Sequence, residues 1–249
     1  MNRGMHQWLV VGLLTIPLLL GGCQPAPTRA TLVDTRLQLG LAWLARGELS
    51  AAERNLQRAL ALAPEDYRTR LAMARFQQQS GDAAAAAESY RQARRLAPQN
   101  GYVLNNYGAF LCGLGQYDAA QRQFSRVAES STGGLRADSI ENSGYCYLNA
   151  GKPEPARDAL AKTVRYDPAR GMLLLAEAER RYGKGRRAQS RLLLDVYQQT
   201  LPASAESLWL EIRFAAQENR PDDARRYGAR LARIFPLSIQ YQHFLANEY

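Results

Sequence analysis

Residues 67–100, YRTRLAMARFQQQSGDAAAAAESYRQARRLAPQN, are one complete copy of a 34-residue pattern that recurs along the chain. The copy has small residues at its eighth and twentieth positions, Ala74 and Ala86, where two helices touch. Gly81 separates the two halves and Pro98 stands near the end, and both residue types stop helices. The stretch therefore predicts a repeat built from helical hairpins.

Six copies can be counted outward from this one. They cover residues 33–66, 67–100, 101–134, 137–170, 171–204 and 205–238, with Leu135 and Arg136 left over between the third and fourth. Five of the six have proline at position thirty-two. The pattern resembles the tetratricopeptide repeat, which implies an all-α fold: a right-handed solenoid of six hairpins. Residues 239–249 are expected to form a capping helix over the last copy.

The fifth and sixth copies depart from the pattern. Glu177 and Glu211 stand where the repeat family has an aliphatic residue, and Gly228 replaces the bulky residue at position twenty-four. The match to the repeat is therefore weaker in these two copies, and their packing is less certain from the pattern.

The N-terminus has the layout of an export signal, with a short polar start, an apolar stretch and the sequence Leu-Gly-Gly-Cys at residues 20–23. This sequence resembles the bacterial lipobox. The resemblance implies a signal peptide over residues 1–22, acyl chains on Cys23, a tether over residues 23–32 and a repeat domain over residues 33–249. Gln24 implies transfer to the outer membrane, with the repeats facing the periplasm. The alternative is an ordinary signal peptide with an incidental cysteine.

The composition argues against an enzyme. The 249 residues include 2 histidines, and loss of the signal peptide would leave only His243, so a zinc site with two imidazoles is not expected. The chain has neither a phosphate-binding loop ending in Lys-Ser or Lys-Thr nor a Gly-x-Ser-x-Gly motif. We expect no catalytic residue, cofactor, metal or small-molecule substrate.

The chain has a formal charge of +9, and some of its basic residues gather in two clusters. An exported protein does not meet nucleic acid, so we interpret the clusters as a solvated face or as a surface for anionic lipid headgroups or acidic proteins. The basic residues concerned are Arg180, Arg181, Lys184, Arg186, Arg187 and Arg191, followed by Arg225, Arg226, Arg230 and Arg233.

In a tetratricopeptide solenoid the first helix of each hairpin lines the concave side. On the first copy this side includes Leu37, Leu41 and Leu44, an apolar strip that predicts a partner-binding site. The alternative is that the tether or the second copy buries these leucines.

On the third and fourth copies the concave positions carry polar and aromatic side chains. Asparagine amides can both donate to and accept from a peptide backbone, so these positions predict peptide recognition. The alternative is that Asn105 and Asn106 fix helix packing around Gly108. The candidate residues are Tyr102, Asn105, Asn106, Asn142 and Tyr145.

Cys112 and Cys146 fall at positions twelve and ten of adjacent first helices. An oxidising periplasm permits a disulfide between them, but the two positions differ in orientation. Small buried thiols are the favoured expectation.

A narrower resemblance rests on Val103-Leu104-Asn105-Asn106-Tyr107-Gly108 and on a tail containing Pro236, Ser238 and Tyr241-Gln242. With the lipobox, these stretches resemble the type IV pilus biogenesis lipoproteins of the PilF/PilW kind. The resemblance implies a pilotin, which binds the pilus secretin and promotes its assembly in the outer membrane. A repeat lipoprotein that acts as an adaptor for peptidoglycan enzymes or proteases is the alternative.

Overall fold

The computed structural model describes residues 28–249, and in this range the chain forms thirteen α-helices and no strand. The lipidation site predicted at Cys23 and the signal peptide lie outside the described residues. The helices are α1 (Arg29–Ala45), α2 (Leu49–Leu62), α3 (Tyr67–Gln79), α4 (Ala83–Leu96), α5 (Gly101–Gly113), α6 (Tyr117–Ser130), α7 (Gly133–Asn149), α8 (Pro153–Tyr166), α9 (Arg170–Gly183), α10 (Arg187–Thr200), α11 (Ala205–Gln217), α12 (Pro221–Ile234) and α13 (Ile239–Leu245).

The predicted all-α solenoid of six hairpins and a capping helix is confirmed. Each copy of the pattern contains one hairpin, from α1 with α2 to α11 with α12, and α13 follows the last. The turns of the first five hairpins use glycine in the left-handed region, as at Gly47 with φ 77° and Gly81 with φ 89°, and Asn219 with φ 56° takes this place in the sixth.

Small residues at position eight admit a bulky residue from the second helix of the same hairpin. A Cβ atom added to Gly108 would lie 2.7 Å from Cε1 of Phe124, and one added to Gly144 would lie 2.7 Å from Cγ of Leu160. Phe124 and Leu160 are fully buried by this close approach. The regular spacing of small and bulky residues thus sets the distance between the two helices of each hairpin.

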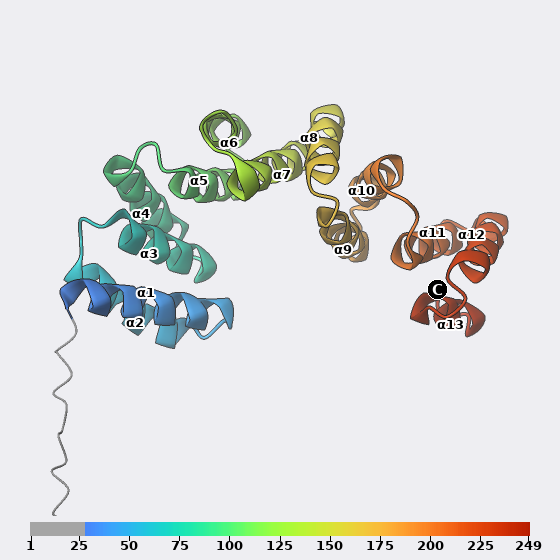
Figure 1. Cartoon of the computed structure of the whole chain (residues 1–249), viewed down its shortest axis with the longest axis horizontal. Helices are drawn as coiled ribbons and strands as arrows, with labels where there is room; N and C mark the ends of the chain where they lie inside the picture. Colours follow the sequence, from blue (N-terminus) through green and yellow to red (C-terminus); the bar gives the residue numbers. More distant parts are fainter. Residues whose placement is uncertain (1–27) are drawn as a thin grey trace, which may run out of the picture.

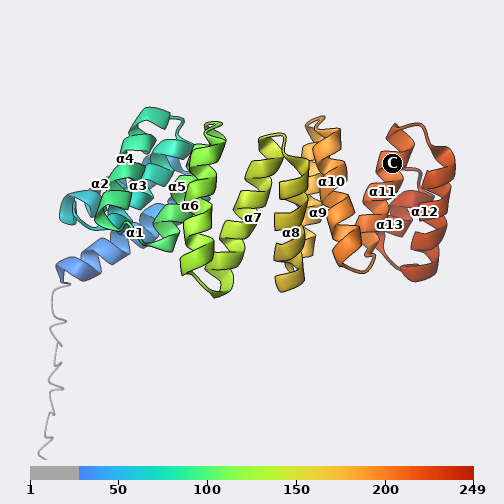
Figure 2. The ribbon, with the colours of Figure 1, turned by 90° about the horizontal axis from the view of Figure 1, so that it is seen from above.

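The hairpins stack into an arch (Figure 1). From α3 to α11 the first helices of the hairpins line the inside of the arch and the second helices lie outside, as the view from above also shows (Figure 2). Each hairpin packs mainly on its neighbours, and the buried hydrophobic residues of the described range form five clusters that follow one another along the stack.

Two helices begin earlier than the repeat register predicts. Helix α1 starts at Arg29, within the expected tether, because the Thr28 hydroxyl caps it by accepting from the Thr31 amide at 3.2 Å. Helix α7 starts at Gly133, so the two extra residues, Leu135 and Arg136, extend its first turn and form no separate linker.

In the fifth and sixth units, the residues that depart from the repeat pattern have specific partners. Glu211 is buried, and its carboxylate binds Arg191 at 2.8 Å and Gln198 at 2.7 Å. The space above Gly228 is filled by Phe244 of α13, whose Cζ would lie 2.1 Å from an added Cβ. A side chain from the capping helix therefore replaces the missing bulky residue.

Candidate protein-interaction surface

The apolar strip expected on the first unit is part of the core. Leu37 is 6% exposed and Leu44 3%, and both pack with Leu56 and Met73 in one cluster, against which Leu41 is partly buried. Helix α1 contacts both α2 and α3. Leu37 and Leu44 lie two turns apart on the same face of α1, and this face is covered by the neighbouring helices. The prediction of an open strip is wrong for Leu37 and Leu44, and the alternative of burial holds.

The predicted polar residues lie on adjacent inner helices, Tyr102, Asn105 and Asn106 on α5 and Asn142 and Tyr145 on α7. Nδ2 of Asn142 donates to Oδ1 of Asn105 at 3.2 Å and joins the two helices. Nδ2 of Asn106 donates to the carbonyl oxygen of Tyr102 at 2.8 Å. Asn105 thus has the packing role given as the alternative, whereas Tyr102 is 61% exposed and open to a partner.

Asn106 also lines a polar hollow of about 350 Å³. The Tyr90 hydroxyl at its edge donates to Oε1 of Gln78 at 2.8 Å. Burial raises the pKa of Tyr90 to about 12 although the charge of Arg75 opposes the shift, so this hydroxyl stays protonated at neutral pH. Amide and guanidinium groups around the hollow suit a peptide backbone. Its lining residues are Leu44, Arg75, Gln78, Gln79, Tyr90, Asn106 and Ala109.

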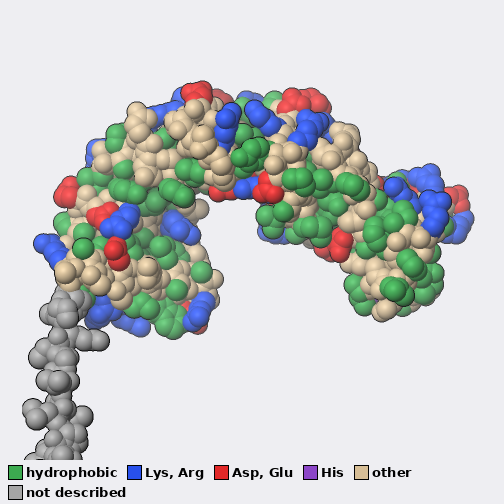
Figure 3. Space-filling view, in the orientation of Figure 1, with side chains coloured by type: hydrophobic (Ala, Val, Ile, Leu, Met, Phe, Trp, Pro, Cys, Tyr) green, Lys and Arg blue, Asp and Glu red, His purple; other side chains and the backbone are tan. Residues whose placement is uncertain are grey.

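An ion cluster ties α7 to α9 beside these asparagines. Arg170 binds Asp138 at 2.6 Å, Asp167 at 3.2 Å and also Glu141. Burial would lower the pKa of Arg170, but hydrogen bonds to the carboxylates outweigh burial and raise it. Glu141 further accepts from the Tyr145 hydroxyl at 3.3 Å. Figure 3 shows charges of both signs gathered at the middle of the inner edge.

Towards the C-terminal end the inner surface becomes apolar. A hollow of about 290 Å³ lies between α9, α11 and α13, and hydrophobic side chains are dense over these helices (Figure 3). Met172 is 47% exposed at this hollow, and the rings of Trp209 and His243 lie 5.8 Å apart on its far side. The edge carries an ion pair between Arg213 and Glu179. Such an apolar hollow with a polar rim has the anatomy of a protein-binding surface.

The arginines around the turn after α9 are not all on a solvated face. Arg181 is buried, donates to Glu177 at 2.7 Å and to Asn149 at 3.0 Å, and lies 5.9 Å from the centre of the Tyr145 ring. The interpretation of this cluster as a solvated or lipid-facing surface is therefore wrong for Arg181. Glu177, at a position expected to be aliphatic, is what allows this guanidinium to be buried.

Cys112 and Cys146 form a disulfide between α5 and α7, with Cα atoms 5.8 Å apart. The expectation of free buried thiols is wrong. The two positions differ by two residues in the repeat register, which is about 200° of rotation on a helix. Side chains that differ by about half a turn on parallel neighbouring helices point towards each other, so the difference in orientation favours the bond.

Among the described residues, no helix is both long enough and apolar enough to span a bilayer. The same residues contain no group of three or more His, Cys, Asp or Glu side chains placed to bind a metal ion.

Comparison with known proteins identifies the family of this chain. Two tetratricopeptide repeat models match residues 37–101 and 77–138. The type IV pilus assembly protein PilF of Pseudomonas aeruginosa is 31% identical over 215 residues, which are 86% of this chain and 85% of that protein. The chain belongs to the PilF family. The resemblance expected from the sequence is thereby confirmed.

Solved structures agree with this assignment. The P. aeruginosa PilF structure matches with a TM-score of 0.61 and 31% identity, covering 88% of this chain and 99% of that one. PilW, a widely conserved type IV pilus biogenesis factor, has the same fold at a TM-score of 0.61 and 24% identity, covering 86% of this chain and 98% of that one. This PilF-family chain is thus a type IV pilus biogenesis protein built as a repeat scaffold, a class that works through protein interaction.

Sequence reasoning missed several residues of the inner surface in this PilF-family protein. Arg75, Gln78 and Gln79 on α3 could have been found by extending the position count to the second unit. Met172 and Trp209 could have been found as apolar residues outside the small-bulky pattern. Nothing in the sequence pattern indicated that Arg170 belongs to this surface. Its partners Asp138 and Glu141 lie 32 and 29 positions earlier and reach it only because α7 stacks on α9.

Proposed function

We propose that this protein is an outer-membrane lipoprotein that binds the type IV pilus secretin and promotes its localisation and assembly, the role of a pilotin. The observation that carries the proposal is the similarity to PilF, which extends over 215 residues, or 86% of the chain, and so includes most of the scaffold. The proposal has two parts. A lipid on Cys23 anchors the protein in the outer membrane, and the inner surface of the arch binds the secretin.

The lipid part rests on residues 20–24. Cleavage before Cys23 would free a cysteine for acylation, and two or more acyl chains hold a protein to a bilayer stably, at about 0.8 kcal/mol per buried methylene. Gln24 supports transfer to the outer membrane, with the repeat domain in the periplasm. Tethering raises the local concentration of secretin subunits at the membrane without any covalent chemistry.

The inner surface supports the second part through two hollows of different character. Amides of Gln78, Gln79 and Asn106 at the first can pair with an extended backbone. Met172, Trp209 and Ile239 at the second can take an apolar side chain. A secretin segment that combines exposed backbone with an apolar anchor fits this surface.

The lipid part is tested by Cys23→Ser. We expect the variant to fold but to leave the outer-membrane fraction, with fewer assembled secretin multimers in that fraction. The measurement is membrane fractionation with detection of both proteins. Normal outer-membrane placement of both proteins in the variant would remove the lipid from the proposal.

The binding part is tested by Met172→Glu, which puts a charge at the rim of the apolar hollow. Leu237→Glu is the matched control, because Leu237 is 93% exposed and lies outside the hollow. We expect secretin co-purification to fall about tenfold in the first variant and to stay unchanged in the second, with equal helicity. Equal retention of secretin by both variants would contradict the proposed surface, and peptidoglycan enzymes or proteases in place of the secretin would favour the adaptor alternative.

A further inference from the structure

A third hollow lies between α7 and α8, beside the connection from α6, and shares no residue with the two inner hollows. Its volume is about 460 Å³, which is in the range of small-molecule sites. The 34-residue period is interrupted at this place. Thr132 stands where five of the six copies have proline, and Arg136 is one of the two extra residues. Both residues line the hollow, so the interruption of the repeat supplies part of its surface.

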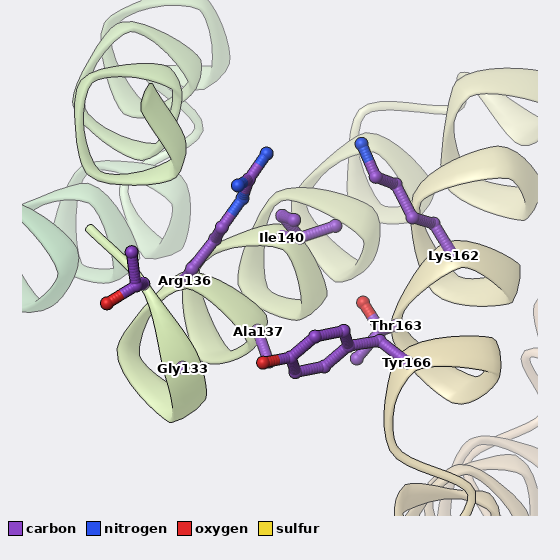
Figure 4. A pocket seen from close by; sticks show the side chains of 8 residues that line it. Gly133, Arg136, Ala137, Ile140, Lys162, Thr163 and Tyr166 are labelled. Carbon is purple, nitrogen blue, oxygen red and sulfur yellow. The ribbon is translucent and has the colours of Figure 1, made fainter. Parts of the chain in front are cut away.

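One side of the hollow is apolar. Ala137 and Ile140 come from α7, and Tyr166 comes from the last turn of α8. In Figure 4 the Tyr166 ring extends from α8 across the hollow towards Ala137, with Ile140 above it. Tyr166 is 65% exposed, so much of its ring is open to a ligand. This side provides a surface for an apolar or aromatic group.

The opposite side carries two cations from different helices. Arg136 belongs to α7 and Lys162 to α8, and both are exposed. Their charged ends lean towards each other above Ile140 (Figure 4). Among the described residues that line the hollow, none is acidic. Two converging cations favour a compact anion, because the guanidinium presents a fork of N–H donors and the ammonium adds a concentrated charge.

A phosphate monoester on an apolar body matches both sides of the hollow. At pH 7 such a group carries a charge of about −1.5 to −2, with a second pKa of about 6, so it can engage two cations at once. A carboxylate offers a single charge. Inorganic phosphate would leave the apolar side without a partner, and a neutral apolar compound would leave both cations without one.

We propose that this hollow binds a phosphate monoester attached to an apolar or aromatic group. The phosphate lies between Arg136 and Lys162, and the apolar group lies on Ile140 and the ring of Tyr166. A soluble phosphate ester and the headgroup of a lipid such as phosphatidic acid share this chemistry. The site is independent of the proposed pilotin role, because its residues lie outside the two inner hollows.

The test uses the purified full chain and phenyl phosphate in a ligand-observed NMR titration at pH 8. We expect a Kd below about 1 mM, with binding at least about fivefold weaker for inorganic phosphate, phenol and benzoate. Lowering the pH from about 8 to about 5 should weaken the binding of phenyl phosphate, because its phosphate loses a charge over this range.

Two variants separate the two sides of the hollow. Arg136→Gln/Lys162→Gln should weaken the binding of phenyl phosphate at least about tenfold. Tyr166→Ala should weaken the binding of phenyl phosphate but not that of inorganic phosphate. Arg186→Gln/Arg187→Gln is the matched control, since it makes the same change in net charge at two exposed residues outside the hollow. Far-UV circular dichroism checks that each variant is folded.

Equal loss of binding in the control pair would show a non-specific charge effect and overturn the site. Benzoate that binds as tightly as phenyl phosphate would overturn the assignment to a phosphate monoester. Absence of binding up to about 10 mM phenyl phosphate would overturn the proposal as a whole.

Vesicles distinguish the two sources of the phosphate. Phosphatidylcholine vesicles that contain phosphatidic acid are added to the chain with phenyl phosphate, and pure phosphatidylcholine vesicles give the baseline. Displacement of phenyl phosphate beyond this baseline, with the same two cations required for vesicle binding, assigns the site to a lipid headgroup. Binding of phenyl phosphate that the vesicles do not displace assigns it to a soluble phosphate ester.

Discussion

Gly108 and Phe124 show how single residues set the geometry of a hairpin. The glycine leaves room for the ring, and the ring in turn is fully buried between α5 and α6. The same relation holds at Gly40 with Leu56 and at Gly144 with Leu160, so the helix spacing is fixed locally in each unit. A side chain at position eight has to displace a buried neighbour.

Gly108→Val is therefore expected to lower the free energy of unfolding by about 1–3 kcal/mol, the usual effect of forcing extra atoms into a packed core. Gly113→Val in the same helix is the control, because nothing lies within 4 Å of a Cβ at Gly113. Urea unfolding followed by circular dichroism measures both. Similar midpoints for the two variants would show that the close approach to Phe124 is not limiting.

Tyr90 makes the free energy of unfolding depend on pH, with lower stability at high pH. Burial raises the pKa of Tyr90 to about 12, above the ordinary tyrosine value of about 10, so the folded state favours the protonated phenol. This contribution to stability is fully present below pH 10.0 and is lost as the pH rises towards about 12.

The corresponding prediction is that Tyr90→Phe loses less stability than the unmodified chain between about pH 9.5 and 11.5. Denaturant unfolding at a series of pH values in this range checks it. Because the other tyrosines are common to both proteins, the difference between the two curves isolates Tyr90. Parallel curves would refute the assignment.

Among the elements, α13 has a role beyond closing the stack. Its Phe244 occupies the space over Gly228. In the other units the residue at this position of the second helix is itself bulky. The ring also lies 5.5 Å from the ring of Tyr249, so the tail forms a small aromatic cluster over α11 and α12. The last unit is therefore completed by a residue from outside it.

This arrangement predicts compensation between two damaging changes. Gly228→Leu alone clashes with Phe244, and Phe244→Ala alone leaves a cavity, each at a cost of about 1–3 kcal/mol. The double variant should recover much of the loss, since leucine at position 228 can fill the space that the ring of Phe244 leaves. A double-mutant cycle by thermal unfolding measures the coupling. Simple additivity would show that the two residues do not share one space.

The sequence allowed the helices to be predicted almost completely, because the period, the glycines and the prolines act within one hairpin. It could not predict features that arise between hairpins. The insertion of Phe244 over Gly228 and the hydrogen bond from Arg181 to Asn149 both depend on side chains from different units. The same limit applies to the site, where the sequence alone left open whether Leu37 faces a partner or is buried by the second copy.

At the scale of the whole molecule, stability is shared between neighbouring units, since each hairpin contacts mainly the next. The disulfide between Cys112 and Cys146 reinforces one such junction, the one between the third and fourth units. The same junction contains the two extra residues, Leu135 and Arg136.

We expect Cys112→Ser/Cys146→Ser to lower the free energy of unfolding by about 2–4 kcal/mol, because the bond closes a loop of 34 residues in the unfolded chain. Denaturant unfolding with and without reductant checks this, and the reductant should affect the unmodified chain but not the variant. A reductant effect of equal size on both proteins would contradict a stabilising role for the bond.

The covalent link near the centre of the arch also has a mechanical consequence. Bending of a stacked array is the sum of small rotations at its joints, and a cross-linked joint rotates least. Bending is then concentrated in the two arms of the arch on either side of α5 and α7. The width of the arch would change mainly through movement of these arms relative to the cross-linked centre.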